Sequence, residues 1–191
     1  MVAEMNSQAL LALGEEKWVD VPDDIEDPVS GLIGRRGFED RARRRLGMHL
    51  HAASALTLVE IDHIDTVRAR YGADCADMIV RGVGQCLLNE VRGHDVVGRI
   101  DASSFAILHT DIDLAAVRAV GQRLRVAVQS MRFYAEDGTA IPVTVSIGID
   151  GMTRSARAQT PDLQNMLARA ADRVEAARAA GCNRVVAPDL L

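Results

Sequence analysis

Apolar residues recur at intervals of four in several segments of the chain, and short β-prone runs lie between those segments. The apolar stripes predict amphipathic helices that start near residue 36 and that cover residues 75–91 and 113–128. The β-prone runs predict strands at 55–61, 96–100, 105–108, 144–149 and 183–186. The small and polar residues 101–104 separate two of these runs and are typical of a β-hairpin turn. The pattern therefore predicts an α/β fold with a sheet that is at least partly antiparallel.

The last predicted helix has a start signal and a stop signal. Thr160 followed by Pro161 predicts its N-terminus, with the hydroxyl as N-cap and the proline in the first helical position. Gly181 is a natural stop. Residues 1–27 instead combine a short apolar piece with an acidic, proline-containing stretch. We therefore expect an acidic N-terminal arm or linker over residues 1–27 and one domain over residues 28–191.

Charge and cysteine usage limit the classes of partner. A formal net charge of −5 argues against a broad nucleic-acid surface, although the arginine-rich run 41–45 is locally basic. Cys75, Cys86 and Cys182 show no metal or disulfide spacing, which suits a reducing compartment. The sequence shows neither a long apolar run nor a signal peptide. We therefore expect a cytoplasmic protein without nucleic-acid or membrane partners.

Several motifs in a consistent order resemble the GGDEF family, the diguanylate cyclase domains that condense two GTP molecules into cyclic di-GMP. The resemblance covers about residues 27–187 and rests on DPVSGLIGRRGF at 27–38, VEIDHIDTVRARYG at 59–72, ADM at 76–78, TVSIGI at 144–149 and AARAAGCNRVV at 176–186. It implies a palm-like fold related to nucleotide cyclases, with a central, mostly antiparallel sheet flanked by helices.

The signature turn of that family is altered in this chain. The resemblance implies two glycines and two acids where this sequence has the degenerate run Asp101, Ala102, Ser103 and Ser104. It places Glu60 at the first metal-ligand position and Ser103 at the second. Metal-assisted phosphodiester formation needs converging carboxylate oxygens, and neutral serine is a poor replacement. We therefore expect no catalytic residues and no resident cofactor, with at most weak Mg²⁺ binding at Glu60.

Other substrate positions are altered as well. The resemblance places Asp77 where the family reads guanine and Arg178 where a late-helix lysine is usual, so Glu60, Asp77 and Arg178 form a vestigial substrate site. Arg68 replaces a guanine-reading asparagine, Asp65 a phosphate-contacting lysine, and Cys182 an arginine. Attraction of the triphosphate becomes repulsion at Asp65, so the resemblance implies an inactive cyclase homologue.

Arg92 and Asp95 retain the R-x-x-D pattern of the family's product-inhibition site. An arginine can donate to guanine O6 and N7, or to a phosphate, and an aspartate can accept from guanine N1 and N2. Arg123, on the predicted helix 113–128, matches a supplementary arginine of product-bound dimers only weakly. The alternative is structural, because a cation at a helix end is favourable and Asp95 can pair with it.

These residues support two hypotheses from different classes. The first is a catalytically inactive GGDEF-like domain that binds cyclic di-GMP through the R-x-x-D site and signals to a protein partner or through its own oligomeric state. The second is a homodimerisation or protein-interaction module that has lost both catalysis and nucleotide binding, with the acidic arm and the helix carrying Arg41–Arg45 as contact surfaces.

Overall fold

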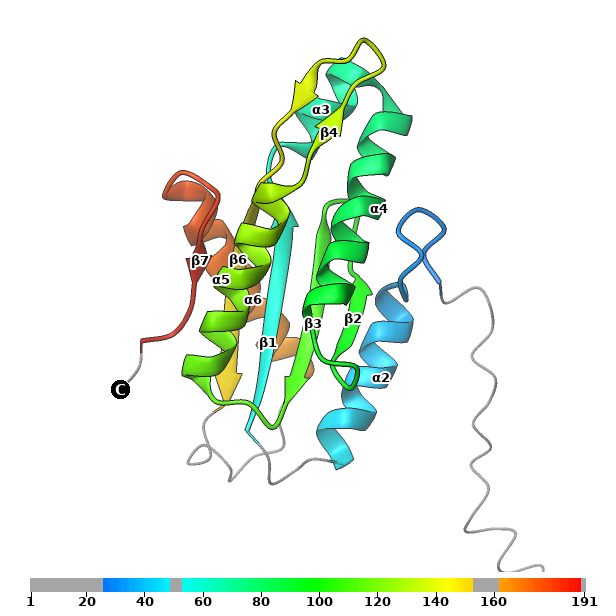
Figure 1. Ribbon diagram of the computed structural model, residues 1–191. Helices are drawn as coiled ribbons and strands as arrows, with labels where there is room; N and C mark the ends of the chain where they lie inside the picture. Colours follow the sequence, from blue (N-terminus) through cyan, green and yellow to red (C-terminus); the bar gives the residue numbers. More distant parts are fainter. Residues whose placement is uncertain (1–25, 49–52, 153–161, 190–191) are drawn as a thin grey trace, which may run out of the picture.

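A central sheet with helices on both faces forms the body of the protein (Figure 1). The computed structural model describes residues 26–48, 53–152 and 162–189. The sheet has the strand order β2-β3-β1-β6-β7, and only its β6–β7 pair is parallel within the described residues. Its strands are β1 (Ser54–Ile61), β2 (Val96–Arg99), β3 (Ser104–Thr110), β6 (Val145–Met152) and β7 (Val185–Val186). The α/β fold with a mostly antiparallel central sheet is therefore confirmed.

The helices form one layer on each face of the sheet. Helices α4 and α5 lie in front of the sheet in Figure 1, and α6 lies behind it. The apolar side chains of α2 and α6 share a second core on that far face. The helices are α2 (Arg35–Met48), α3 (Ile64–Tyr71), α4 (Ala73–Glu90), α5 (Leu114–Ser130) and α6 (Leu163–Ala179). The helices predicted from residue 36 and over 75–91 and 113–128 are present within two residues of their expected ends.

Alternation along β1 determines which side chains reach each layer. Ala55 and Val59 belong to the core under α4 and α5, whereas Leu56 and Leu58 belong to the core under α2 and α6. Because successive strand residues face opposite sides, Thr57 points with the first group and Glu60 with the second. Thr57 and Glu60, which belong to the two candidate sites discussed below, therefore point to opposite faces of the sheet.

Helix α6 packs directly on the backbone of β6 at Gly148. A Cβ atom at this position would lie 2.0 Å from the carbonyl oxygen of Ala170 and 2.8 Å from the amide nitrogen of Val174. Both distances are too short for any side chain, so only glycine permits this approach. Gly148 thereby fixes the depth of α6, which carries Arg178 toward β1.

Two features of the fold differ from the sequence predictions. Helix α6 begins at Leu163, and its N-cap is Asp162, whose carboxylate accepts a hydrogen bond from the Gln164 amide at 2.9 Å. The predicted start at Thr160 and Pro161 is therefore too early, and those two residues lie outside the described residues. The small hairpin of β4 (Phe133–Tyr134) and β5 (Ala140–Ile141) was not predicted, because two-residue strands carry no periodic signal. Gly181, at φ 109°, follows the end of α6 as expected.

The predicted boundary between arm and domain falls inside the fold. Glu26 forms an isolated bridge with Ile33, and Asp27 accepts hydrogen bonds from Ser30 and Arg99. Both residues therefore belong to the folded part of the chain. The remainder of the predicted arm, residues 1–25, lies outside the described residues. Among the helices that are described, none combines the length and apolarity needed to cross a bilayer.

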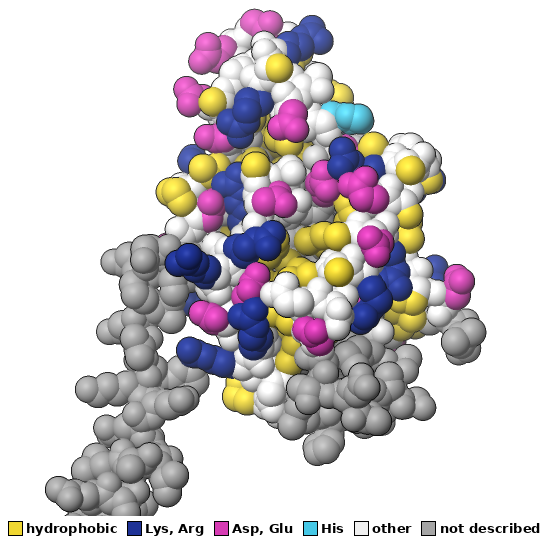
Figure 2. All heavy atoms as spheres, turned by 180° about the vertical axis from the view of Figure 1, so that it is seen from behind, with side chains coloured by type: hydrophobic (Ala, Val, Ile, Leu, Met, Phe, Trp, Pro, Cys, Tyr) yellow, Lys and Arg dark blue, Asp and Glu magenta, His cyan; other side chains and the backbone are white. Residues whose placement is uncertain are grey.

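Figure 2 shows the far side of the molecule, where basic and acidic side chains are interspersed. On α2, Arg43 pairs with Glu39 at 2.7 Å and with Asp40 at 3.5 Å. Arg41 and Arg44 are exposed and have no ion-pair partner among the residues that the structure describes. Within the described residues, Arg43 is thus the one arginine of the basic run at 41–45 that forms an ion pair.

Candidate functional site

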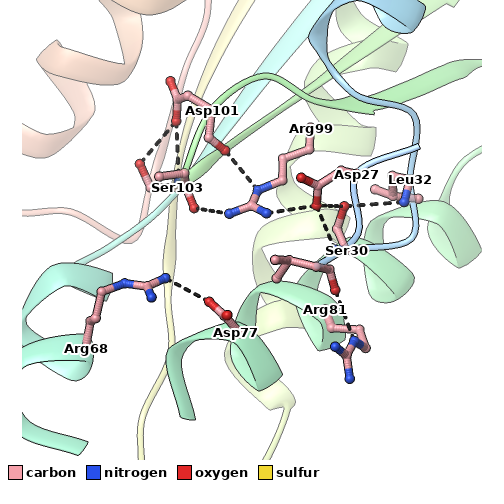
Figure 3. Close-up of polar contacts among 11 residues, drawn as sticks. Asp27, Ser30, Leu32, Arg68, Asp77, Arg81, Arg99, Asp101 and Ser103 are labelled. Atoms are coloured by element: carbon pink, nitrogen blue, oxygen red, sulfur yellow. Dashed lines mark hydrogen bonds and ion pairs between the residues drawn. The ribbon is translucent and has the colours of Figure 1, made fainter. Parts of the chain in front are cut away.

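The β2–β3 turn, residues 100–103, is held from within by one arginine. The guanidinium of Arg99 donates to the carbonyl oxygens of Asp101 at 2.9 Å and Ala102 at 2.8 Å. The Asp101 carboxylate in turn accepts from the Ser103 amide at 3.0 Å, as Figure 3 shows. The polar groups of this turn therefore bond mainly to one another.

Arg99 also joins the turn to the loop before α2. Its Nη1 lies 2.8 Å from Oδ1 of Asp27, and the same oxygen accepts from the amide and the hydroxyl of Ser30 (Figure 3). Burial alone would raise the pKa of Asp27, but the hydrogen bonds from Arg99 and Ser30 outweigh it and lower the pKa. Arg99 is 9% exposed, so this ion pair is largely shielded from water.

The carboxylate at the predicted first metal-ligand position is bound by an arginine. Arg178 Nη1 lies 2.9 Å from Glu60 Oε1, while Ser104 stands opposite Glu60 in the β1–β3 ladder and Ser103 is the last residue of the turn. Burial raises the pKa of Glu60, and nearby Glu175, Asp101 and Asp62 add to this, although Arg178 opposes it. Glu60 thus has a cation beside it where a metal ion would need a second carboxylate.

Asp62 cannot supply that second carboxylate. It is 7% exposed, and its oxygens accept from the hydroxyls of Thr144 and Ser146, both at 2.7 Å, and from the Asn183 amide at 3.1 Å. Its role is to connect the end of β1 to β6 and to the turn before β7. Over the described ranges, no three histidine, cysteine or acidic side chains are grouped so as to hold a metal ion.

The two positions that would read guanine bond to each other. Arg68 Nη2, on α3, lies 2.9 Å from Oδ1 of Asp77, on α4 (Figure 3). Asp65 is exposed in the first turn of α3. Cys182 lies at the far end of α6, with its Sγ 3.8 Å from Nε2 of His63. The structure therefore places Asp77 and Glu60 in separate ion pairs.

The R-x-x-D segment forms a tight turn between α4 and β2. The Asp95 amide donates to the Arg92 carbonyl at 3.0 Å, and the Arg92 amide donates to Oδ2 of Asp95 at 3.1 Å. The Arg92 side chain is exposed, and its guanidinium has no hydrogen bond or ion pair with any described residue. The structure therefore does not show the ion pair between the Arg92 and Asp95 side chains that the structural alternative predicted.

Asp95 points into the domain. Its side chain is 3% exposed, and Oδ2 lies 3.1 Å from Nδ1 of the buried His109, on β3. Burial alone would raise the pKa of Asp95, but the hydrogen bond and charge of His109, together with the Arg92 amide, lower it. Oδ1 is buried and has no hydrogen-bond partner in the described residues. His109 thus holds the acidic residue of the R-x-x-D pattern inside the domain.

Arg123 lies next to this turn. Its Nε donates to the Glu90 carboxylate at 3.0 Å, and its Nη2 donates to the Glu90 carbonyl oxygen. Glu90 is the last residue of α4, two positions before Arg92. The structure therefore brings the three predicted ligand-binding residues to one end of α4.

Sequence reasoning missed three residues that organise these sites. Asp27 was assigned to the arm, and neither Arg99 nor His109 was given a role. An open pocket of about 300 Å³ beside the turn is lined partly by Asp27 and Arg99, and by none of Glu60, Asp77 and Arg178. The available signal was that Asp27 is the first residue of the motif at 27–38 and that Arg99 lies two positions before the altered turn.

Related proteins match most of this chain. An uncharacterized 19.3 kDa protein in the repSA 5′ region of Streptomyces ambofaciens is 30% identical over 144 residues, which cover 75% of this chain and 73% of that protein. The probable diguanylate cyclase DgcT of Escherichia coli is 25% identical over 166 residues, or 86% of this chain. The matched part spans only 36% of DgcT, and 35% of the Bacillus subtilis protein YhcK.

Solved structures show the same fold. The GGDEF domain of DgcB from Caulobacter crescentus, crystallised with cyclic di-GMP, has a TM-score of 0.79 at 21% identity, covering 86% of this chain and 93% of that one. The diguanylate cyclase SiaD from Pseudomonas aeruginosa, in complex with its activator SiaC, has a TM-score of 0.78 at 23% identity, covering 97% and 67%. The family described as the GGDEF domain of diguanylate cyclases matches residues 25–184. With this match and the sheet topology in agreement, the chain belongs to the GGDEF domain family.

Proposed function

We propose that this chain is a catalytically inactive GGDEF domain that binds cyclic di-GMP at the end of α4. The observation that carries the proposal is a contrast between two sites. At the cyclase site, which holds the positions that the resemblance assigns to substrate and metal, the charged groups form the ion pairs Arg68–Asp77 and Arg178–Glu60. The guanidinium of Arg92, in contrast, is exposed and has no partner in the described part of the chain. This contrast supports ligand binding at the R-x-x-D turn rather than at the cyclase site.

The loss of catalysis follows from the charges around Glu60. Joining two GTP molecules needs cations that neutralise the triphosphate and activate a hydroxyl, and such cations need several oxygen ligands. Glu60 instead meets Arg178 at 2.9 Å, and the turn opposite it offers Ser103 and Ser104. A metal ion would have to displace the guanidinium of Arg178 and would still find only one free carboxylate.

Substrate binding is opposed as well. The Arg68–Asp77 pair occupies both groups that would face a guanine base, and Asp65 adds a negative charge on α3. At the turn, Asp101 adds a carboxylate where the phosphates of GTP would approach the backbone. Binding of GTP therefore carries an electrostatic cost and gains none of the usual contacts.

Binding of cyclic di-GMP is supported by the residues at the end of α4. Arg92 can donate two hydrogen bonds to guanine O6 and N7 or to a phosphate of the ligand. Arg123 lies beside it and adds positive charge, although Glu90 partly neutralises that charge. Asp95 shapes the turn by accepting from the Arg92 amide. A domain with the same fold was crystallised with this ligand.

Calorimetric titration of the full chain with cyclic di-GMP tests the proposal. We expect micromolar or tighter binding that is lost in Arg92→Ala. Arg70→Ala is the matched control, since Arg70 is also an exposed arginine but lies on α3, at the opposite end of α4 (Figure 1). No heat of binding with correctly folded protein would refute the receptor function.

A second candidate function is a protein-interaction module without a nucleotide ligand. Two observations favour it: Asp95 is turned inward, and α2 presents Arg41 and Arg44 without ion-pair partners among the described residues. This candidate predicts that Arg41→Glu with Arg44→Glu changes the molar mass of the full chain by light scattering, or abolishes binding to a protein partner. An unchanged mass and unchanged partner binding would remove this surface from consideration.

A further inference from the structure

His109 is a buried polar residue that neither the cyclase site nor the R-x-x-D pattern accounts for. It lies near the end of β3 and is 1% exposed. Its Nδ1 lies 3.1 Å from Oδ2 of Asp95, and its Nε2 lies 3.2 Å from Oγ1 of Thr57, on β1. The ring therefore links the R-x-x-D turn to the centre of the sheet.

The protonation pattern follows from the partners. The lowered pKa keeps Asp95 ionised near neutral pH, and an ionised carboxylate only accepts hydrogen bonds. Nδ1 of His109 must therefore carry the proton that it shares with Asp95. Nε2 faces the hydroxyl of Thr57, which can donate to a neutral ring or accept from a charged one. Each end of the imidazole has a complementary partner, so the ring is well fixed.

The register of the hairpin explains this contact. Val96 pairs with Leu108 in the β2–β3 ladder, and the next position outward is Asp95, just before β2, on one side and His109, on β3, on the other. Cross-strand neighbours in an antiparallel pair lie close enough for their side chains to bond. The side chain of Asp95 is consequently directed toward the sheet.

This contact determines what Asp95 can offer a ligand. Oδ2 already accepts from the Arg92 amide and from His109. Oδ1 is buried, and Nε2 of the half-exposed His94 lies 3.9 Å from it. Reading guanine through N1–H and N2–H takes two outward-facing acceptors. While the His109 bond is in place, Asp95 does not present them.

We propose that His109 is a specificity-determining residue of the cyclic di-GMP site. By holding Asp95 inward, it leaves recognition of the base to Arg92, at the O6 and N7 edge. The inference rests on the proposed receptor function. It follows that the 2-amino group of guanine contributes little to binding, and that cyclic di-IMP, which lacks only that group, binds about as well as cyclic di-GMP.

Two substitutions separate the Asp95 contact from the Thr57 contact. His109→Asn keeps an amide N–H near the position of Nδ1, so it retains a donor to Asp95. His109→Gln places its amide near the position of Nε2, so it keeps a partner for Thr57 but removes the donor to Asp95. The second change frees Asp95 to turn outward and accept from the 2-amino group.

The test is calorimetry of cyclic di-GMP and cyclic di-IMP against the full chain and both variants, with folding checked by circular dichroism. We expect a ratio of dissociation constants near one for the unchanged chain and for His109→Asn. For His109→Gln we expect cyclic di-GMP to bind about tenfold more tightly than cyclic di-IMP, the order of one hydrogen bond to a charged group.

Three other outcomes of this calorimetry would contradict the inference, and they differ in what they say about the receptor function. A clear preference for cyclic di-GMP in the unchanged chain overturns the inference without any variant, because Asp95 would then already read the 2-amino group. Equal ratios in the unchanged chain and in His109→Gln overturn the role of His109 but leave the receptor function standing. Absence of binding in all three proteins overturns both proposals.

Discussion

The guanidinium of Arg68 lies 2.9 Å from the carboxylate of Asp77, joining α3 to α4 at two positions that the resemblance assigns to guanine recognition. Because both side chains are more than 30% exposed, the pair contributes little to stability. Under the proposed function, its effect is on binding, since each group satisfies the other in place of a substrate.

We predict that Arg68→Ala lowers the free energy of unfolding by less than about 1 kcal/mol and does not create GTP binding. Freeing Asp77 leaves Asp65 and the altered turn unchanged, and these still disfavour a triphosphate. Urea denaturation and calorimetry with GTP measure the two quantities, and Arg41→Ala serves as the control. Saturable GTP binding in Arg68→Ala would show that the ion pair alone closes the site.

Arg99→Ala should be among the more destabilising arginine substitutions. Arg99 donates to Asp101, Ala102 and Asp27, and its loss leaves a largely buried carboxylate without its cation. We expect a loss of about 2–4 kcal/mol in urea denaturation. Arg44→Ala, at an exposed position without an ion-pair partner in the described residues, should change stability by less than about 0.5 kcal/mol. Equal effects of the two changes would contradict the role assigned to Arg99.

The pH dependence of stability should reflect Asp27. Its pKa is lower in the folded chain than in the unfolded chain, because hydrogen bonds from Arg99 and Ser30 outweigh burial. At pH values between these two pKa values, the unfolded chain therefore binds more protons than the folded chain. The stabilising contribution of Asp27 is present above the unfolded pKa of about 4, and it is lost as the pH falls through the folded pKa. Asp27→Asn should flatten this acid loss in melting temperatures measured from pH 7 to pH 3. The control is Asp172→Asn, at an exposed position on α6. An identical acid profile for both variants would argue against the Asp27 contribution.

Gly148→Ala should destabilise the domain far more than Gly47→Ala. A Cβ at residue 148 would overlap the backbone of α6, whereas a Cβ at residue 47 meets no atom within 4 Å. We expect a loss of about 3 kcal/mol or more for the first change, and a neutral or slightly stabilising effect, up to about 1 kcal/mol, for the second. Thermal unfolding of both variants measures the difference. Similar melting temperatures would mean that α6 can move away from β6 at little cost.

Local patterns predicted most of the fold, because the helices and long strands have periodic apolar faces. They could not predict the two-residue strands β4 and β5, or Asp162 as the N-cap of α6, since several polar residues compete for that role. The contact between Asp95 and His109 depends on the register of β2 against β3, which is set by the whole hairpin. The Arg99–Asp27 pair spans 72 positions and likewise has no local signature.

The central claim is that the nucleotide site at the end of α4 persists while the cyclase site does not. The most direct measurement is a titration of one sample of the full chain, first with GTP and Mg²⁺ and then with cyclic di-GMP, followed by chromatography of the nucleotides. The account predicts no saturable GTP heat, no product, and saturable binding of cyclic di-GMP. Formation of cyclic di-GMP from GTP, or the absence of cyclic di-GMP binding by folded protein, would contradict it.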